Sequence, residues 1–461
     1  MGAGLGGCIL AESVCHLMDV TLVELPENSN YLSQINDLSY PANLNPHLGS
    51  GLGGSTKYWH NGLMEIDESI FTRHWPYPKS ALNEYYQKAF RRLSKVSIKR
   101  AEEVFQNLRR QFIDLGVPES LLRQGLYYPN ERMNVWSSSS LEGRVRLIRA
   151  EALGFKVNSD SMIGSLEIII GNEKLSISSD FYVLAAGGIG TPVLLQKLAK
   201  KVSSPSLQHA GRHYEDHPIG FVAEVSTNRP FYRLWNYKIY GVSGRFRIPI
   251  SITEGGLQIS FQLRPAYQSK GENPFFSILN DLRNHPLRLK NYIKLLFKFD
   301  DLFEIISFKL GFNFPTRKFS VLMVAEQAPQ SNLSIENSEL IGCITRRWIL
   351  KEDYLKSLDK ALDTFLQMLT QGITQYRIFA GWQNRLASSA HHSGTARMAS
   401  DPNSGVCDEH GRVYGLNNLF ICDGSMIPAS GFANTGLTIA ALGLKLGDYL
   451  KNIYHEPGGH L

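Results

Sequence analysis

The feature that most constrains the fold is a glycine-rich turn at the start of the chain. Gly2, Gly4 and Gly7 form the pattern G-x-G-x-x-G. A helical stretch over residues 8–18 follows, and then an apolar strand over residues 20–23 that Glu24 closes. An acid about 20 residues after such a turn, at the end of the next strand, is typical of a dinucleotide-binding unit. The pattern therefore predicts an α/β fold with a parallel sheet.

Each residue type in this pattern suits one part of a nucleotide. The glycines let the backbone approach a pyrophosphate, whose charge would meet the positive end of the helix that follows. Glu24 would accept hydrogen bonds from the ribose hydroxyls. The alternative is a glycine-rich loop in which the glycines serve the backbone alone.

Two further segments combine small residues with turns. Residues 49–54 are rich in glycine and run into Ser55 and Thr56 without an apolar period, which predicts a loop. An ordinary surface turn is the alternative. Residues 182–192 read as strand, turn and helix, and Ala186 and Gly187 lie at the turn, where small residues permit close approach of a ligand or a strand.

The rest of the chain alternates between helical and strand-like patterns. Helical spacing marks residues 79–115, and a hairpin is expected from residues 166–170 and 174–177 around a Gly171-Asn172 turn. Residues 218–350 are rich in aromatic and β-branched runs, which predicts a mostly antiparallel sheet. Leucines from Leu355 to Leu369 mark an amphipathic helix after it.

Composition excludes several classes of protein. The 461 residues, 43% of them hydrophobic, predict more than one domain. A formal charge of +6 without a long basic run makes nucleic acid an unfavoured partner. The five cysteines are scattered and lack a C-x-x-C pair, so no disulfide framework or metal site is expected, and a reducing compartment such as the cytoplasm is weakly favoured.

One segment could touch a membrane. Residues 276–319 interleave apolar with basic side chains, and an interfacial helix is one interpretation of that pattern. Acids at positions 300, 301 and 304 interrupt it, and a solvated helix face over a core stripe is the commoner outcome. Peripheral membrane contact is therefore the less favoured alternative.

The last 75 residues carry the second informative pattern. They contain His391-His392-Ser393-Gly394-Thr395, then Asp423-Gly424-Ser425, then Asn434-Thr435-Gly436 before an apolar helix at residues 439–450. Together with the N-terminal turn, these segments resemble the glucose-methanol-choline oxidoreductases, which are FAD enzymes that oxidise alcohols. The resemblance is concentrated in residues 1–66, 180–220 and 385–455.

The resemblance implies roles for individual residues. The histidine of H-x-x-G-T, His391, would be the catalytic base, with Asn434 as its partner and the adjacent His392 as the nearer rival. Many members carry Asn where this chain has Trp59, and in this feature the chain resembles the bacterial sugar and polyol dehydrogenase branch. The residues expected to contact FAD are Gly2, Gly4, Gly7, Glu24, Gly53, Gly54, Ser55, Thr56, Ala186, Gly187, Asp423 and Thr435.

The resemblance also implies a division into two domains. A Rossmann-type FAD-binding domain with a parallel sheet is expected from residues 1–66, 135–222 and 385–461. A substrate domain, built on a mostly antiparallel sheet with flanking helices, is expected from residues 67–134 and 223–384. The fold class is α/β, or α+β overall.

The chain departs from the family pattern at two places. Thr435 stands where a proline usually follows the catalytic Asn, so the turn is less fixed. The strand that normally precedes G-x-G-x-x-G is absent from the sequence, and we expect the start to be truncated or misassigned, with FAD binding in question otherwise. Asp216-His217-Pro218 also resembles a family segment, to which we assign a structural role.

Several functions remain open at this point. The favoured one is an FAD-dependent dehydrogenase or oxidase that acts on the CH-OH group of a sugar, polyol or similar alcohol and passes electrons to an unknown external acceptor. The alternatives are a nicotinamide-linked dehydrogenase, a lyase or isomerase on the same flavoprotein fold, and a non-catalytic homologue. No metal is required by any of the assigned residues.

Overall fold

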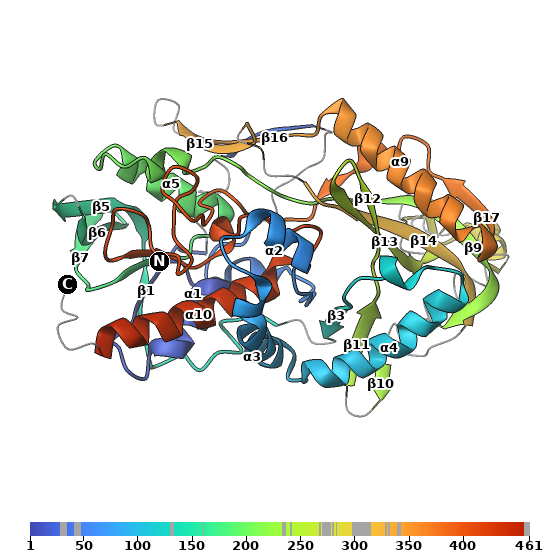
Figure 1. Cartoon of the computed structure of the whole chain (residues 1–461), viewed down its shortest axis with the longest axis horizontal. Helices are drawn as coiled ribbons and strands as arrows, with labels where there is room; N and C mark the ends of the chain where they lie inside the picture. Colours follow the sequence, from blue (N-terminus) through green and yellow to red (C-terminus); the bar gives the residue numbers. More distant parts are fainter. Residues whose placement is uncertain are drawn as a thin grey trace.

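The computed structural model describes most of the chain and arranges it in two halves (Figure 1). One half contains short parallel strands and the helices α1 (Leu5–Val14), α5 (Gly187–Ala199) and α10 (Thr435–His455). The other half is an antiparallel sheet flanked by the helices α9 (Glu352–Met368) and α4 (Ile98–Asp114). The described residues are 1–27, 35–40, 48–129, 133–159, 161–232, 237–239, 242–266, 269, 278, 281–282, 284–296, 315–327, 330, 332–338 and 343–455.

The first half contains two pairs of parallel strands. β1 (Thr21–Glu24) pairs with β4 (Arg146–Arg149), and β8 (Tyr182–Leu184) pairs with β19 (Leu419–Ile421). The Met1 amino group donates to the Val183 carbonyl at 2.7 Å, and the Gly2 N–H donates to the Val23 carbonyl at 2.8 Å. The first two residues therefore lie between β1 and β8.

Helix α1 packs closely against its neighbours because glycine leaves room for their backbone. α1 (Leu5–Val14) lies beside α10 (Thr435–His455), and a Cβ on Gly6 would collide with the Cys422 carbonyl. The predicted helix and strand after the first turn are both confirmed. α1 begins three residues earlier than the apolar pattern indicates, since Gly6 and Gly7 are tolerated where they allow this contact.

The second half is built on an antiparallel sheet, as predicted. Its strand order is β12-β13-β14-β9-β17, and the short β18 also pairs with β9. These strands are β9 (Pro218–Tyr232), β12 (Ile250–Glu254), β13 (Leu257–Pro265), β14 (Pro315–Ala325), β17 (Ile373–Ile378) and β18 (Ala387–Ser388). The predicted amphipathic helix is α9 (Glu352–Met368), and it covers one face of this sheet.

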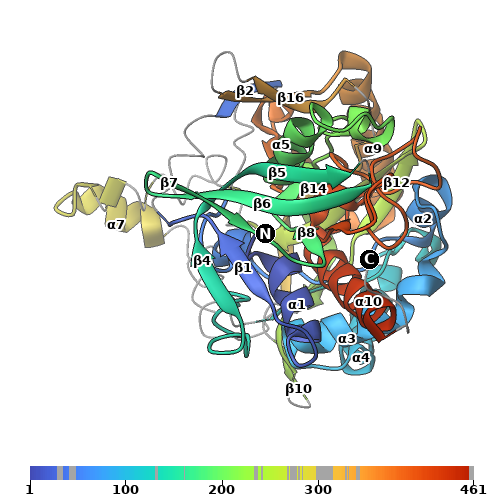
Figure 2. The same ribbon diagram turned by 90° about the vertical axis from the view of Figure 1, so that its left-hand side faces the viewer.

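Smaller sheets complete the fold. The predicted hairpin is confirmed within the sheet β5-β6-β7, which lies in front of the N-terminus in Figure 2. The other small sheets are β10-β11-β3 and β15-β16-β2. Their strands are β2 (Ile35–Tyr40), β3 (Leu126–Pro129), β5 (Glu151–Ser159), β6 (Met162–Ile170), β7 (Glu173–Ile177), β10 (Tyr237–Ile239), β11 (Val242–Arg247), β15 (Ser334–Ser338) and β16 (Cys343–Ile349).

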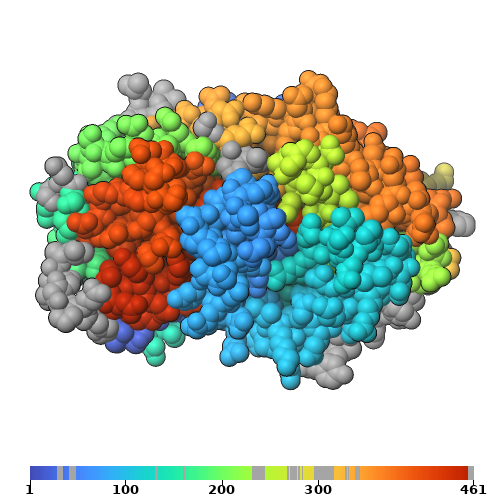
Figure 3. Space-filling model, viewed as in Figure 1, coloured from blue at the N-terminus to red at the C-terminus, as the bar shows by residue number. Residues whose placement is uncertain are grey.

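The remaining helices link the two halves. In the face shown in Figure 3, the blue segment around α2 and α3 packs between the red C-terminal segment and the cyan helix α4. One buried apolar cluster accordingly extends from Ala3 through both halves to Leu442. The linking helices are α2 (Glu68–His74) and α3 (Asn83–Ser94). Whether the chain divides at the predicted domain boundaries stays a prediction.

The segment with mixed apolar and basic residues is described only in part. Most of residues 276–319 lies outside the described residues, and its described portion includes α7 (Leu289–Leu296), which lies at the periphery in Figure 2. Leu289 and Ile293 of α7 are exposed. Among the residues that the structure describes, no helix has the length and apolar character needed to cross a bilayer.

The packing of α9 on the sheet can be tested by mutation. Phe365 is fully buried and stacks on Phe261 of β13, with ring centroids 4.4 Å apart. We expect Phe365→Ala to lower the free energy of unfolding by about 3–5 kcal/mol, because it leaves a cavity under α9. The change is measured by urea denaturation, with Tyr376→Ala at an exposed position of β17 as the control. A loss as small as that of the control would contradict this packing.

Candidate active site

A cavity of about 850 Å³ lies between the two halves. Its size falls in the range of small-molecule and cofactor pockets. Most of the residues that the sequence assigned to one site meet here. The assigned residues that line it are Gly2, Gly4, Glu24, Gly54, Ser55, Thr56, Ala186, Gly187, His391, Asp423, Asn434 and Thr435. Gly7 and Gly53 do not line it.

The glycine-rich turn forms one end of the cavity. Gly2 has a φ of +98°, and a Cβ there would collide with the Ala185 carbonyl, so the backbone itself requires glycine. Gly4 caps α1, and a Cβ at Gly4 or at Gly187 would meet no atom within 4 Å. The glycines thus differ in their roles. Gly2 serves the fold and Gly4 borders open space, whereas Gly187 borders open space and also has a positive φ of +78°.

Glu24 lies at the same end of the cavity and is held by the backbone. Its carboxylate accepts hydrogen bonds from the N–H groups of Ala3, Leu25 and Gly51. Burial raises the pKa of Glu24, and these three hydrogen bonds act in the opposite direction. The acid therefore lies beside the glycine turn, where the sequence pattern predicts it.

Asp423 connects α5 to the C-terminal segment. One carboxylate oxygen accepts hydrogen bonds from the Gly187 N–H at 2.8 Å and the Thr191 hydroxyl at 2.6 Å, and the other accepts from the Ser425 N–H at 2.8 Å. Burial raises the pKa of this carboxyl. Asp423 thus fixes the turn before α5 while it borders the cavity.

The second glycine loop forms a wall of the cavity. Residues Gly54–Lys57 make a short 3-10 helix, and the Thr56 hydroxyl donates to the Gly53 carbonyl at 2.5 Å and accepts from the Val135 N–H at 3.1 Å. Trp59, which follows this helix, donates from its indole nitrogen to the Met133 carbonyl at 2.6 Å. The loop is thus an ordered part of the site rather than a surface turn.

The histidine and asparagine assigned to catalysis are paired. Asn434 Nδ2 lies 3.2 Å from His391 Nε2, although the two residues are 43 positions apart. Burial lowers the pKa of His391 to about 4, with the charge of Asp216 opposing it. The imidazole is therefore neutral at pH 7. His391 Nδ1 has no hydrogen-bond partner within the described part of the chain.

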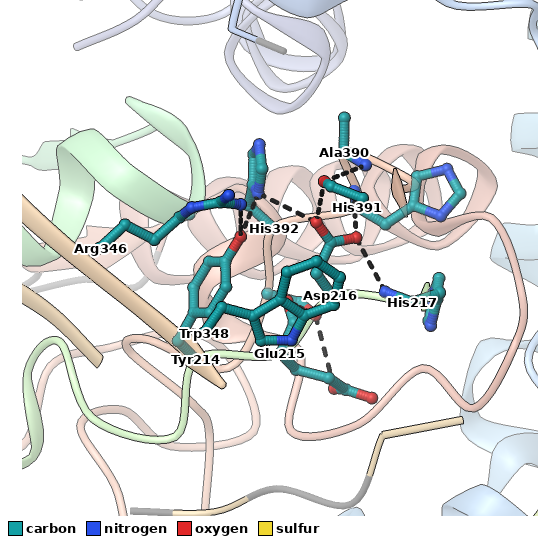
Figure 4. Close-up of polar contacts among 12 residues, drawn as sticks. Tyr214, Glu215, Asp216, His217, Arg346, Trp348, Ala390, His391 and His392 are labelled. Carbon is teal, nitrogen blue, oxygen red and sulfur yellow. Dashed lines mark hydrogen bonds and ion pairs between the residues drawn. The ribbon is translucent and has the colours of Figure 1, made fainter. Parts of the chain in front are cut away.

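The neighbouring His392 belongs to a different network (Figure 4). Its Nδ1 lies 2.6 Å from the Tyr214 hydroxyl and 3.6 Å from Asp216. Arg346 donates to the same hydroxyl at 3.2 Å and forms an ion pair with Asp37. Both histidines line the cavity, but only His391 pairs with Asn434.

Asp216 lies directly behind His391. Its carboxylate accepts hydrogen bonds from the Ser388 hydroxyl, from the His217 N–H at 2.8 Å and from the His391 N–H at 3.1 Å. Burial raises the pKa of Asp216. The sequence analysis gave this segment a structural role, and the geometry adds that it holds the backbone of the assigned base.

Sequence reasoning missed the residues at the other end of the cavity. Tyr128 of β3 and Gln262 and Arg264 of β13 line it there. The available signal was the alternation in residues 257–265, LQISFQLRP, which places Gln262 and Arg264 on the same face of the strand.

No cluster of three or more potential metal ligands occurs among the described residues. The five cysteines are all free. The cavity is lined by an imidazole, an amide and carboxylates, which His391, Asn434, Glu24 and Asp423 contribute.

Comparison with known proteins agrees with this arrangement. Residues 348–443, which include His391 and Asn434, match the family model described as GMC oxidoreductase. A 2-methyl-1,2-propanediol dehydrogenase of Mycolicibacterium austroafricanum is 33% identical over 14% of this chain and 12% of its own length. A putative GMC-type oxidoreductase of Acanthamoeba polyphaga mimivirus is 24% identical over 58% of this chain and 42% of its own length.

A solved structure extends the fold likeness to the whole chain. Pyridoxine 4-oxidase from Mesorbium loti superposes with a TM-score of 0.58 over 98% of both chains, at 15% identity. The alignments with the two curated relatives span less than half of their lengths. The C-terminal part of the chain thus resembles the GMC oxidoreductases, and the chain as a whole shares its fold with that solved structure, with one half that contains short parallel strands and one half built on an antiparallel sheet. The branch of the GMC oxidoreductases that the chain resembles most stays a prediction.

The influence of Asp216 on the assigned base can be measured directly. Its negative charge raises the pKa of His391, against the larger effect of burial. We expect Asp216→Asn to lower that pKa below the wild-type value of about 4, as followed by NMR titration of 13C-labelled histidine. Asp353→Asn, at an exposed position of α9, is the control. An unchanged or raised pKa in Asp216→Asn would show that the two groups are not coupled.

Proposed function

We propose that the protein binds FAD and oxidises the CH-OH group of an alcohol, with His391 as the base. The observation that carries this proposal is the His391–Asn434 pair in the same cavity as the glycine turn. The family match supports the reaction class, and the alcohol oxidoreductases among the relatives support an alcohol as donor.

The described residues fit FAD at the glycine end. Open space beside Gly4 and Gly187 leaves room for a diphosphate against the backbone, at the start of α1. The first turn of α1 holds no acidic side chain that would oppose the charge. Gly2, Gly4, Glu24, Ala186 and Gly187 would hold the nucleotide. Ser55, Thr56, Asp423 and Thr435 would border the flavin ring.

His391 would remove the hydroxyl proton of the substrate. Asn434 can donate to Nε2 only while that nitrogen is unprotonated, and this is the form that a base needs. Bound FAD would supply the acceptor for the hydride that leaves the carbon. Asn434 would also donate to the developing alkoxide and so orient the C–H bond.

The start of α10 supports the same assignment. The helix begins at Thr435, four residues before the apolar pattern indicates, and Thr435, Gly436 and Ile439 line the cavity. No acidic residue lies in its first turn. The positive end of α10 would therefore stabilise negative charge on the reduced flavin. A proline at position 435 is not needed to begin the helix.

The glycine assignments can be separated by two matched variants. We expect Gly4→Ala to fold with the wild-type melting temperature but to bind FAD about tenfold or more weakly, because its methyl group would occupy the space for the diphosphate. Gly2→Ala should lose stability as well, since φ is +98° and its Cβ meets Ala185. Flavin content and thermal unfolding are measured on both. Full FAD binding by Gly4→Ala would contradict the assignment.

The base is tested by flavin reduction. Anaerobic addition of sugars and polyols should reduce the bound flavin and so lower its absorbance at about 450 nm. We expect His391→Asn to slow this bleaching by about 10²- to 10⁴-fold without loss of flavin, as for removal of a general base. The exposed His16→Asn serves as the control. In the wild type the rate should fall as pH drops through about 4, where His391 becomes protonated.

The outcomes distinguish the competing functions. Flavin that is bound but never bleached by alcohols would favour a lyase or isomerase on this fold. A chain that binds no flavin would favour a non-catalytic homologue. Rapid bleaching in His391→Asn would assign the base elsewhere, with His392 as the first candidate because it also lines the cavity.

A further inference from the structure

Strand β13 presents two different faces. Ile259, Phe261 and Leu263 alternate with Gln258, Ser260, Gln262 and Arg264, and the whole strand is largely buried. The apolar set packs towards α9, as the Phe261–Phe365 contact shows. The polar set includes Gln262 and Arg264, which line the cavity. Buried polar atoms that have no hydrogen-bond partner are costly, so any such atoms on this face call for a ligand.

The surroundings of Gln262 and Arg264 on this wall are otherwise apolar. Leu322 and Val324 of β14 and Ile219 of β9 are the other cavity-lining residues of this sheet's interior strands. Register explains why they lie together, since Gln262 pairs with Leu322 and Val324 pairs with Ile219. A guanidinium on an apolar wall has a strong electrostatic preference for a negative partner.

No carboxylate of the described residues satisfies Arg264. Within the described residues, Arg264 donates a hydrogen bond from Nη2 to the Tyr128 hydroxyl at 3.3 Å, and its guanidinium lies over the Tyr128 ring. Its Nε is buried and has no hydrogen-bond partner among the described residues, and the same holds for Oε1 of Gln262, whose exposed fraction is 3%. The acids that line the cavity, Glu24, Glu151 and Asp423, belong to the first half of the fold.

Tyr128 connects this wall to the proposed catalytic pair. A Cβ on Gly62 would lie 2.8 Å from the Tyr128 ring and 3.1 Å from Asn434 Nδ2. Tyr128 and Asn434 therefore border the same small space next to Gly62. At the other end of the Tyr128 side chain, Arg264 contacts the Tyr128 hydroxyl. His391 and Arg264 line the same cavity, so one ligand there has both residues in its surroundings.

We propose that Arg264 and Gln262 form an anion-binding subsite, and that the alcohol substrate carries an anionic group, a carboxylate or a phosphate ester. Arg264 binds the anion, and Gln262 binds an adjacent hydroxyl through its free acceptor. This subsite rests on the proposed function, because it defines the substrate of the same cavity.

Binding and turnover are measured separately to test it. The full chain with FAD added is titrated by calorimetry under anaerobic conditions with glucose, gluconate and glucose 6-phosphate, and flavin bleaching is recorded with each. We expect at least one anionic sugar to bind about tenfold or more tightly than glucose, as one charge-assisted contact implies. Gluconate and glucose 6-phosphate distinguish a carboxylate from a phosphate.

Variants show whether Arg264 is responsible. Arg264→Gln should remove the preference for the anion, and Arg264→Lys should retain part of the preference. Arg377→Gln is the matched control, because Arg377 lies in the same sheet on β17 and pairs with Glu224 away from the cavity-lining residues. Thermal unfolding of each variant separates lost binding from lost structure.

Each result decides between the two proposals. Absence of any preference for the anion in the wild type overturns the subsite, and so does a preference that survives in Arg264→Gln. If glucose bleaches the flavin in that case, the proposed oxidoreductase function still stands. If the anion binds through Arg264 but no alcohol bleaches the flavin, the subsite stands and the proposed reaction fails.

Discussion

The geometry of the site depends on the buried carboxylate of Asp216. It joins the start of β9 to residues 388–391, about 170 positions later, by accepting hydrogen bonds from Ser388, His217 and His391. A buried carboxylate without such donors would be strongly unfavourable, so the loss of any one of these hydrogen bonds would destabilise the fold at this point. Because Asp216 holds the backbone N–H of His391, the imidazole remains available to the cavity. Asp216 thus fixes the backbone position of His391, the proposed base.

Buried carboxylates also hold the glycine end of the cavity in place. Asp423 accepts hydrogen bonds from Gly187, Thr191 and Ser425, and Glu24 accepts them from three backbone N–H groups. In both cases a buried carboxylate joins segments that are distant in sequence. Loops that carry functional groups are held as firmly here as strands would be, which suits a site that must present fixed donors to a ligand.

The sequence predicted those parts of the structure that local backbone chemistry decides. The turn at Gly2 and Gly4, the second turn at Gly187 and the spacing of His391 each restrict the chain over a few residues, and the structure brings them to one cavity. The antiparallel sheet and α9 followed from periodicity. Helix starts were less well predicted, because Gly6 and Thr435 are accommodated by tertiary contacts that a local pattern does not contain.

The cavity wall that carries Gln262 and Arg264 was not predictable in the same way, because it depends on the register between strands. Polar alternation in residues 257–265 marks a face, but whether that face meets solvent or a cavity is decided by how β13 pairs with β14 and where Gly62 places Tyr128. The apolar face under α9 anchors the strand, and this anchoring fixes Gln262 and Arg264 opposite the His391–Asn434 pair. One face of the strand thus contributes to the core under α9, and the other face supplies Gln262 and Arg264 to the cavity, where the proposed selectivity would arise.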